Sequence, residues 1–238
     1  MTVLALKPTH WRTPALLALA ALAADIAIAH GVAAGDRGYI EHVSGPQIGA
    51  FLYLGAKHMV TGYDHLLFLF GVIFFLYRLR DIAAYVTLFA IGHSTTLLAG
   101  VLLGTHVNSY LIDAIIGLSV VYKALDNLGV YKRWLGFEPN AKAAVLVFGL
   151  CHGLGLATKL QDFTMSPDGL VVNLVSFNVG VEIGQLLALS AILIVMGYWR
   201  RTASFRRHAF AANVLLALAG VALAGYQLIG FFGEGVPA

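Results

Sequence analysis

Long apolar runs separated by short polar connections make up most of this chain. Seven of the runs have roughly the length that a helix needs to cross a hydrocarbon core ~30 Å thick. They lie near residues 14–33, 49–77, 82–104, 109–128, 142–160, 168–198 and 209–232. The pattern predicts an all-α protein, a polytopic membrane helix bundle.

Composition supports the same class and excludes two others. Hydrophobic residues form 59% of the 238 residues and charged residues 11%, so the apolar surface exceeds what one soluble core of this length could hide. The basic residues stand in short clusters rather than on a continuous stripe, which argues against nucleic acid as a partner. The single cysteine, Cys151, excludes a disulfide framework or a thiolate metal cluster within one chain.

The basic clusters also predict an orientation in the lipid bilayer. Lys and Arg are concentrated in the connections "YRLRD", "VYKRWLGFEPNAK" and "YWRRTASFRRH", whereas "THVN" and "QDFTMSPDG" contain neither. The positive-inside rule makes the first three connections cytoplasmic and the last two external. Strict alternation of the runs then puts the C-terminus outside.

The first apolar run has two interpretations. Lys7 and Arg12 precede "PALLALAALAADIAIA" and then small residues, which is typical of a secretory signal peptide. Asp25 weakens that apolar stretch, so an uncleaved first transmembrane helix is the alternative. We therefore divide the chain into residues 1–34, a signal peptide or first transmembrane helix, and one transmembrane domain, residues 35–238, with six core transmembrane helices.

Ionisable residues recur at similar depth in the predicted helices. Four of them lie near mid-depth on different helices: His65, His93, His152 and Glu182. Because isolated ionisable groups in lipid are costly, we expect these side chains to converge. His58 and Asp113 lie nearer the external ends of their helices, which would suit a first binding position above the central group.

The stretch "HMVTGYDH" can be interpreted in two ways. In a continuous helix, seven residues rise ~10.5 Å, so His58 and His65 would share a face as successive binding positions. Alternatively, Thr61-Gly62 breaks the helix, with the Thr hydroxyl capping the next segment, which Asp64 and His65 would open. Irregular backbone at such depth is tolerated where it lines an enclosed cavity.

Two further patterns concern helix packing. Asn178, Glu182 and Gln185 form a polar stripe on an otherwise apolar helix, and we expect the stripe to face the bundle interior. Small residues permit close helix approach at three places: Gly100-xxx-Gly104, Gly149-xxx-Gly153 and Gly180-xxx-Gly184.

The combination of imidazole and carboxylate indicates metal chemistry. A lone histidine in a membrane helix is commonly a helix-to-helix hydrogen bond, but polar contacts of that kind generally use Ser, Thr, Asn or Gln. Several histidines with carboxylates are a ligand set for a divalent transition metal, which could be nickel, cobalt, zinc, copper or iron. A proton relay and a purely structural network are the alternatives.

Four motifs carry a family resemblance: "GAKHMVTGYDHLLFL", "IGHSTTL", "FGLCHGLGLA" and "FNVGVEIGQ". Over residues 48–232 the chain resembles the second branch of the HupE/UreJ family of bacterial membrane proteins. The resemblance implies a nickel permease of the bacterial inner membrane that works beside metalloenzyme maturation proteins. It also implies that His58, Asp64, His65 and His93 are ligands or gating residues and that His152 and Glu182 complete the path. Met59 departs from the family, which often has Pro there.

The remaining alternatives are different classes of protein. An intramembrane metal-dependent enzyme, a hydrolase or an oxidoreductase, could use the same ligands on a lipid-soluble substrate. A metal-delivery accessory protein could also use them. The glycines of "GLCHGLGLA" do not form a nucleotide-binding loop, because the Gly-Lys-Ser/Thr ending is missing. Uptake by this chain would therefore be driven by membrane potential.

Overall fold

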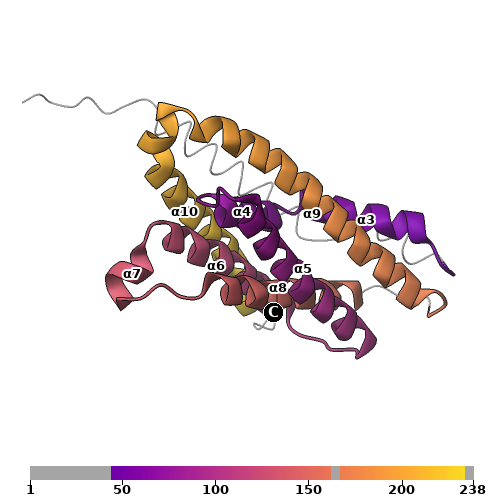
Figure 1. The fold of residues 1–238 in the computed structure, drawn as a ribbon. Coiled ribbons are helices and arrows are strands. Elements are labelled where there is room, and N and C mark those ends of the chain that lie inside the picture. Colours follow the sequence, from indigo (N-terminus) through magenta and orange to yellow (C-terminus); the bar gives the residue numbers. More distant parts are fainter. Residues whose placement is uncertain (1–43, 162–166, 234–238) are drawn as a thin grey trace, which may run out of the picture.

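The computed structural model describes residues 44–161 and 167–233, and the elements of that part of the chain are eight α-helices (Figure 1). In chain order they are α3 (Ile48–Thr61), α4 (Tyr63–Ile73), α5 (Leu79–Leu102), α6 (Ser109–Asn127), α7 (Val130–Leu135), α8 (Ala141–Gln161), α9 (Leu170–Arg200) and α10 (Ala203–Gly233). The all-α prediction is confirmed. The segment predicted as a signal peptide or first transmembrane helix lies outside the described residues.

Four of the described helices, α5, α8, α9 and α10, are long and apolar enough to cross a membrane. The chain is therefore a multi-pass membrane protein. The other helices depart from a simple span: α3 has 14 residues and α4 has 11, while α6 has 19 residues but carries three charged residues, Asp113, Lys123 and Asp126.

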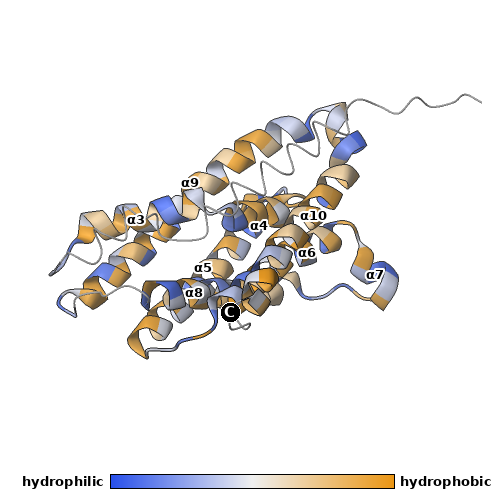
Figure 2. Ribbon diagram, turned by 180° about the vertical axis from the view of Figure 1, so that it is seen from behind, coloured by the Kyte–Doolittle hydropathy of each residue, from blue (hydrophilic) through white to orange (hydrophobic). Residues whose placement is uncertain are grey.

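The outer surface of the bundle has the character of a lipid-facing surface. Figure 2 shows apolar residues along most of each long helix. Large aliphatic side chains lie fully outside the core, with Ile194 of α9 74% exposed and Ile229 of α10 75% exposed. A soluble protein of this size rarely exposes apolar surface on this scale, whereas lipid accommodates it without cost.

Glycines bring helices α3 and α9 into backbone contact, and the two helices lie side by side (Figure 1). A Cβ atom on Gly180 would collide with the carbonyl oxygen of Leu52, and one on Gly184 would lie 2.6 Å from the carbonyl oxygen of Ala56. The paired residue numbers rise together, so the two helices run parallel.

The other two extensive pairs, α5 with α8 and α6 with α10, are built in the same way. Gly149 meets the backbone of Phe89, and a Cβ on Gly153 would collide with the carbonyl oxygen of His93, so α5 and α8 are also parallel. In α6 and α10 the order reverses, because Gly117 meets Ala224 whereas Gly220 meets Val121. These two helices are antiparallel.

The small-residue prediction is confirmed for the Gly149 and Gly180 pairs and is wrong at Gly104. A Cβ on Gly104 would have nothing within 4 Å, and the residue has a φ of +62°. It follows the end of α5, where its N–H bonds the carbonyl of Val101 and the N–H of Thr105 bonds that of Gly100. Gly104 therefore terminates a helix, a role that favours glycine for its left-handed conformation.

Side chains from α6 and α9 hold the last carbonyl groups of α4. Asn127 Nδ2 donates to the carbonyl oxygen of Gly71 at 2.8 Å. The guanidinium of Arg200 donates to the carbonyl oxygens of Ile73 and, at 2.9 Å, Phe74. These contacts supplement the bonds that the N–H groups of Phe74 and Leu76 donate to the carbonyls of Gly71 and Ile73, and they fix the helix whose other end carries Asp64 and His65.

Candidate metal centre

A break between α3 and α4 brings His58 next to His65. Helix α3 ends at Thr61, Gly62 has extended backbone angles (φ −72°, ψ 106°), and α4 begins at Tyr63. The ring centroids of the two histidines lie 5.1 Å apart, about half the ~10.5 Å that a continuous helix would impose. The helix break of the second interpretation is therefore confirmed, and it brings the two rings together.

The break does not use the Thr61 hydroxyl, and Gly62 leaves space beside it. Thr61 Oγ1 donates back to the carbonyl oxygen of Lys57 at 2.8 Å, and no side chain caps the start of α4, so the predicted cap is wrong. A Cβ on Gly62 would lie 2.6 Å from His65 Nδ1 and 3.0 Å from Asp64 Oδ1. A larger residue at this position would require one or both side chains to move.

His65 lies at the centre of four imidazole rings contributed by α3, α4, α5 and α8. Its ring centroid is 5.1 Å from that of His58, 5.1 Å from that of His152 and 6.3 Å from that of His93. His65, His93 and His152 are all buried, the last two at 1% and 2% exposure. The predicted convergence of these three mid-depth histidines therefore occurs, and His58 joins them.

Polar contacts orient two of the rings. His65 Nδ1 lies 3.0 Å from Asp64 Oδ1, and His152 Nδ1 lies 2.7 Å from the carbonyl oxygen of Phe148. Because a carbonyl oxygen only accepts, His152 Nδ1 carries the proton and its Nε2 keeps a lone pair. This arrangement is usual for metal-binding histidines.

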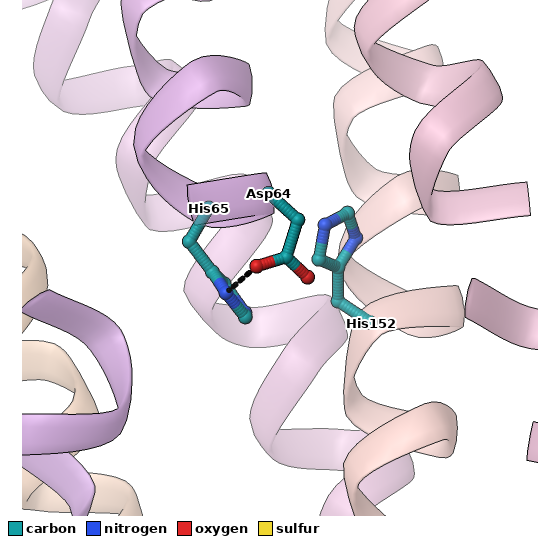
Figure 3. Close-up of side chains that lie close together, drawn as sticks. All are labelled: Asp64, His65 and His152. Carbon is teal, nitrogen blue, oxygen red and sulfur yellow. Dashed lines mark hydrogen bonds and ion pairs between the residues drawn. The ribbon is translucent and has the colours of Figure 1, made fainter. Parts of the chain in front are cut away.

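Asp64, His65 and His152 form the tightest group of candidate ligands in the described part of the chain. One ligand atom from each lies within 4.8 Å of the others. Figure 3 shows the three side chains directed toward one another, with the Asp64 carboxylate between the two rings. A single ion could contact all three after small side-chain movements.

Several buried ring nitrogens in this cluster make no hydrogen bond to any residue that the structure describes. They are Nε2 of His58, His65 and His152 and both ring nitrogens of His93. A buried polar atom without a partner costs free energy, and natural proteins rarely keep several together. Converging imidazole lone pairs have the donor chemistry that nickel, cobalt, zinc and copper prefer.

Aromatic side chains enclose the histidines. Phe89 lies 5.0 Å from the ring of His152 and is stacked on that of His93 at 6.1 Å. Phe68 and Phe177 lie against His152 and His58 at 5.7 and 6.1 Å. These apolar walls keep bulk water from the ligand atoms and so strengthen their electrostatic interactions with a bound cation.

Glu182 is the one predicted site residue that the structure does not bring to the cluster. Within the described residues it is exposed, whereas Asn178 and Gln185 of the same helix are buried. The expectation that the whole stripe faces inward is therefore wrong at Glu182. On a helix, Glu182 points about 40° from Asn178 and about 60° from Gln185, which is enough to move it onto the outer face of α9.

The structure also reveals a charged residue that sequence reasoning overlooked. Lys159 of α8 pairs with the buried Asp113 of α6, with Nζ 2.7 Å from Oδ2. The available signal was spacing, because Lys159 follows His152 by seven residues and therefore shares its helix face.

A family model described as "HupE / UreJ protein" matches residues 34–234. No curated protein and no solved structure matches significantly.

Proposed function

The chain belongs to the HupE/UreJ family, and from that premise we propose that it is a membrane permease for a divalent transition-metal ion, with nickel as the cargo that the family resemblance favours. The observation that carries the proposal is the buried group of Asp64, His65 and His152, whose ligand atoms lie within 4.8 Å of one another. The metal ion is the substrate of this site.

The proposed topology has six core transmembrane helices, in which α3 and α4 form one interrupted span. The directions of the paired helices support it. In a chain that crosses the membrane back and forth, two spans run parallel when their numbers in the chain differ by an even number. This holds for α3 and α9, in the first and fifth spans, and for α5 and α8, the second and fourth spans. The third and sixth spans, α6 and α10, should be antiparallel, and they are.

The orientation follows from the basic connections. Arg78, Arg80, Lys132, Arg133 and the arginines near the α9–α10 turn lie at the ends of spans that the positive-inside rule assigns to the cytoplasm. We propose a bacterial inner-membrane protein with an external C-terminus. The start of α6 and the end of α8 then lie toward the outside.

The ligand chemistry suits transport better than storage. Neutral imidazoles with a carboxylate bind a divalent ion yet can release it, unlike a closed cage of four thiolates. We propose Asp64, His65 and His152 as the principal ligands and His58 and His93 as the neighbours that receive or pass on the ion. Their unpartnered ring nitrogens support this role.

The interrupted span supports the same function. Membrane transporters commonly bind substrate where a helix is broken, because the freed backbone and side chains can face an enclosed polar site. Here the break at Gly62 adjoins both His58 and Asp64. Membrane potential would drive uptake, since a divalent ion gains twice the ~2.3 kcal/mol per charge per 100 mV.

An intramembrane metalloenzyme is the second candidate, and one observation favours it. Three protein ligands within an aromatic enclosure also match a catalytic metal site, in which the ion would be a resident cofactor. The two functions differ in how firmly the ion is held. An enzyme should keep near-stoichiometric metal through a chelator wash, whereas a permease should lose it.

Nickel binding by the purified protein tests the proposal. After a chelator wash, calorimetry should detect reversible nickel binding to the wild type, and His152→Ala should weaken it by more than about tenfold. His208→Ala, which changes an exposed histidine of α10, is the matched control and should bind as the wild type does. Equal binding by the two variants would remove the histidine cluster from the proposal.

A further inference from the structure

A second acidic group lies near the histidine cluster, in an ion pair between α6 and α8. The Asp113 carboxylate is 6% exposed and accepts from Lys159 Nζ at 2.7 Å, while the Lys159 side chain is 21% exposed. The carboxylate is thus held inside the bundle, and the ammonium group retains some access to its surroundings.

Helix geometry relates this pair to the histidines. His152, Gly155 and Lys159 follow one another at spacings of three and four residues, which puts them on one face of α8. Asp113 Oδ1 lies 3.7 Å from where a Cβ on Gly155 would be. At 1.5 Å per residue, Gly155 is only about 4.5 Å along the helix axis from His152, so the carboxylate lies about one turn from the cluster.

The chemistry of the pair is unusual for a purely structural contact. Removing two charges from water costs more than their attraction commonly returns, and a well-packed apolar pair would join α6 to α8 at least as well. A carboxylate is also an effective oxygen ligand for a divalent cation. Lys159 is a flexible ammonium that a cation of higher charge could displace.

We propose that the Asp113 carboxylate is a second binding station for the divalent cation, one helical turn from the histidine cluster, and that the Lys159 ammonium occupies it between ions. The proposal rests on the proposed function. An arriving ion exchanges with the ammonium, which moves aside. The ammonium then returns to Asp113 once the ion has moved on to the histidines, so that binding at the station is favourable but easily reversed, as conduction requires.

This role predicts that substitutions of Lys159 and Asp113 change the half-saturating nickel concentration in opposite directions. Lys159→Gln removes the competing cation, so it should lower the half-saturating nickel concentration for uptake by about threefold to tenfold. Asp113→Asn removes the ligand, so it should raise that concentration by a similar factor. A merely structural pair would give losses of the same sign in both variants, because each leaves one buried charge unpaired.

The experiment is nickel uptake into proteoliposomes with a negative interior potential, measured over a range of nickel concentrations. Lys132→Gln is the matched control, because Lys132 forms an exposed pair with Glu138 at 3.1 Å, and its uptake should equal that of the wild type. Asp113→Lys combined with Lys159→Asp keeps an ion pair but moves the carboxylate to α8. A station role predicts that this exchange does not restore the wild-type half-saturating concentration, whereas a structural role predicts that it does.

The outcomes separate the two proposals. No uptake by the wild type would overturn the proposed permease function itself. Wild-type uptake, together with Asp113 and Lys159 variants that shift half-saturation in the same direction or not at all, would overturn only the second station. Opposite shifts, with the exchange variant unrestored, would support it.

Discussion

The imidazole rings of His58 and His65 lie 5.1 Å apart, centroid to centroid, with His58 near the end of α3 and His65 near the start of α4. The extended backbone at Gly62 replaces part of a helical turn and so shortens the distance between them. A sequence spacing that would separate two side chains along a regular helix therefore brings them together here. In the proposed permease, the break makes His58 and His65 parts of one binding site rather than successive positions.

Gly62→Ala should damage this site more than it damages the helix. The new Cβ would lie 2.6 Å from His65 Nδ1, so the ring or the backbone must move, and nickel affinity should fall by at least about tenfold. Gly49→Ala in α3 is the control, because a Cβ there meets nothing within 4 Å. Calorimetric titration of both variants measures the effect, and unchanged affinity in Gly62→Ala would show that the crowding is relieved without moving the ligands.

Asp64→Asn and Glu182→Gln should differ although both neutralise a carboxylate. Asp64 contacts His65 and belongs to the tightest ligand group, so its substitution should weaken nickel binding by about tenfold or more. Glu182 is exposed on α9, and its substitution should leave affinity within about twofold. Comparable losses in the two variants would return Glu182 to the central site, as the family resemblance implies.

Gly153→Ala should destabilise the helix pair that presents His93 and His152. The added Cβ would collide with the carbonyl oxygen of His93, and overpacking of this kind costs about 1–3 kcal/mol. Thermal unfolding in detergent should show a lower midpoint for this variant. Gly197→Ala in α9 meets nothing within 4 Å and should unfold at the wild-type temperature, so equal midpoints would argue against tight α5–α8 packing.

Much of the architecture could be predicted from the sequence, because a helix that crosses lipid needs a long run of apolar residues. The predicted apolar runs cover every described helix except α7, with α3 and α4 in a single run. Paired glycines identified the close helix contacts at Gly149 and Gly180. Gly104 has the same spacing but ends a helix. Spacing alone does not distinguish a glycine that packs from one that adopts a left-handed backbone.

The candidate site was harder to predict than the helices that carry it. Mid-depth position correctly grouped His65, His93 and His152, because depth follows directly from sequence position within a span. It failed at Glu182, since the rotation of a helix about its own axis depends on its neighbours. Spacing puts Lys159 on the helix face of His152, but its pairing with Asp113 also depends on α6 lying beside α8, which the sequence does not show.

Nickel uptake by the double variant Asp64→Asn/His65→Ala tests the central claim most directly. Equal amounts of folded wild-type and variant protein are reconstituted in liposomes, and uptake is followed under a negative interior potential. The account predicts concentrative uptake by the wild type and none above empty liposomes by the variant, because the principal ligands are gone. Uptake by the variant at the wild-type rate would contradict it and would leave the histidine cluster as a structural network or an enzymatic site.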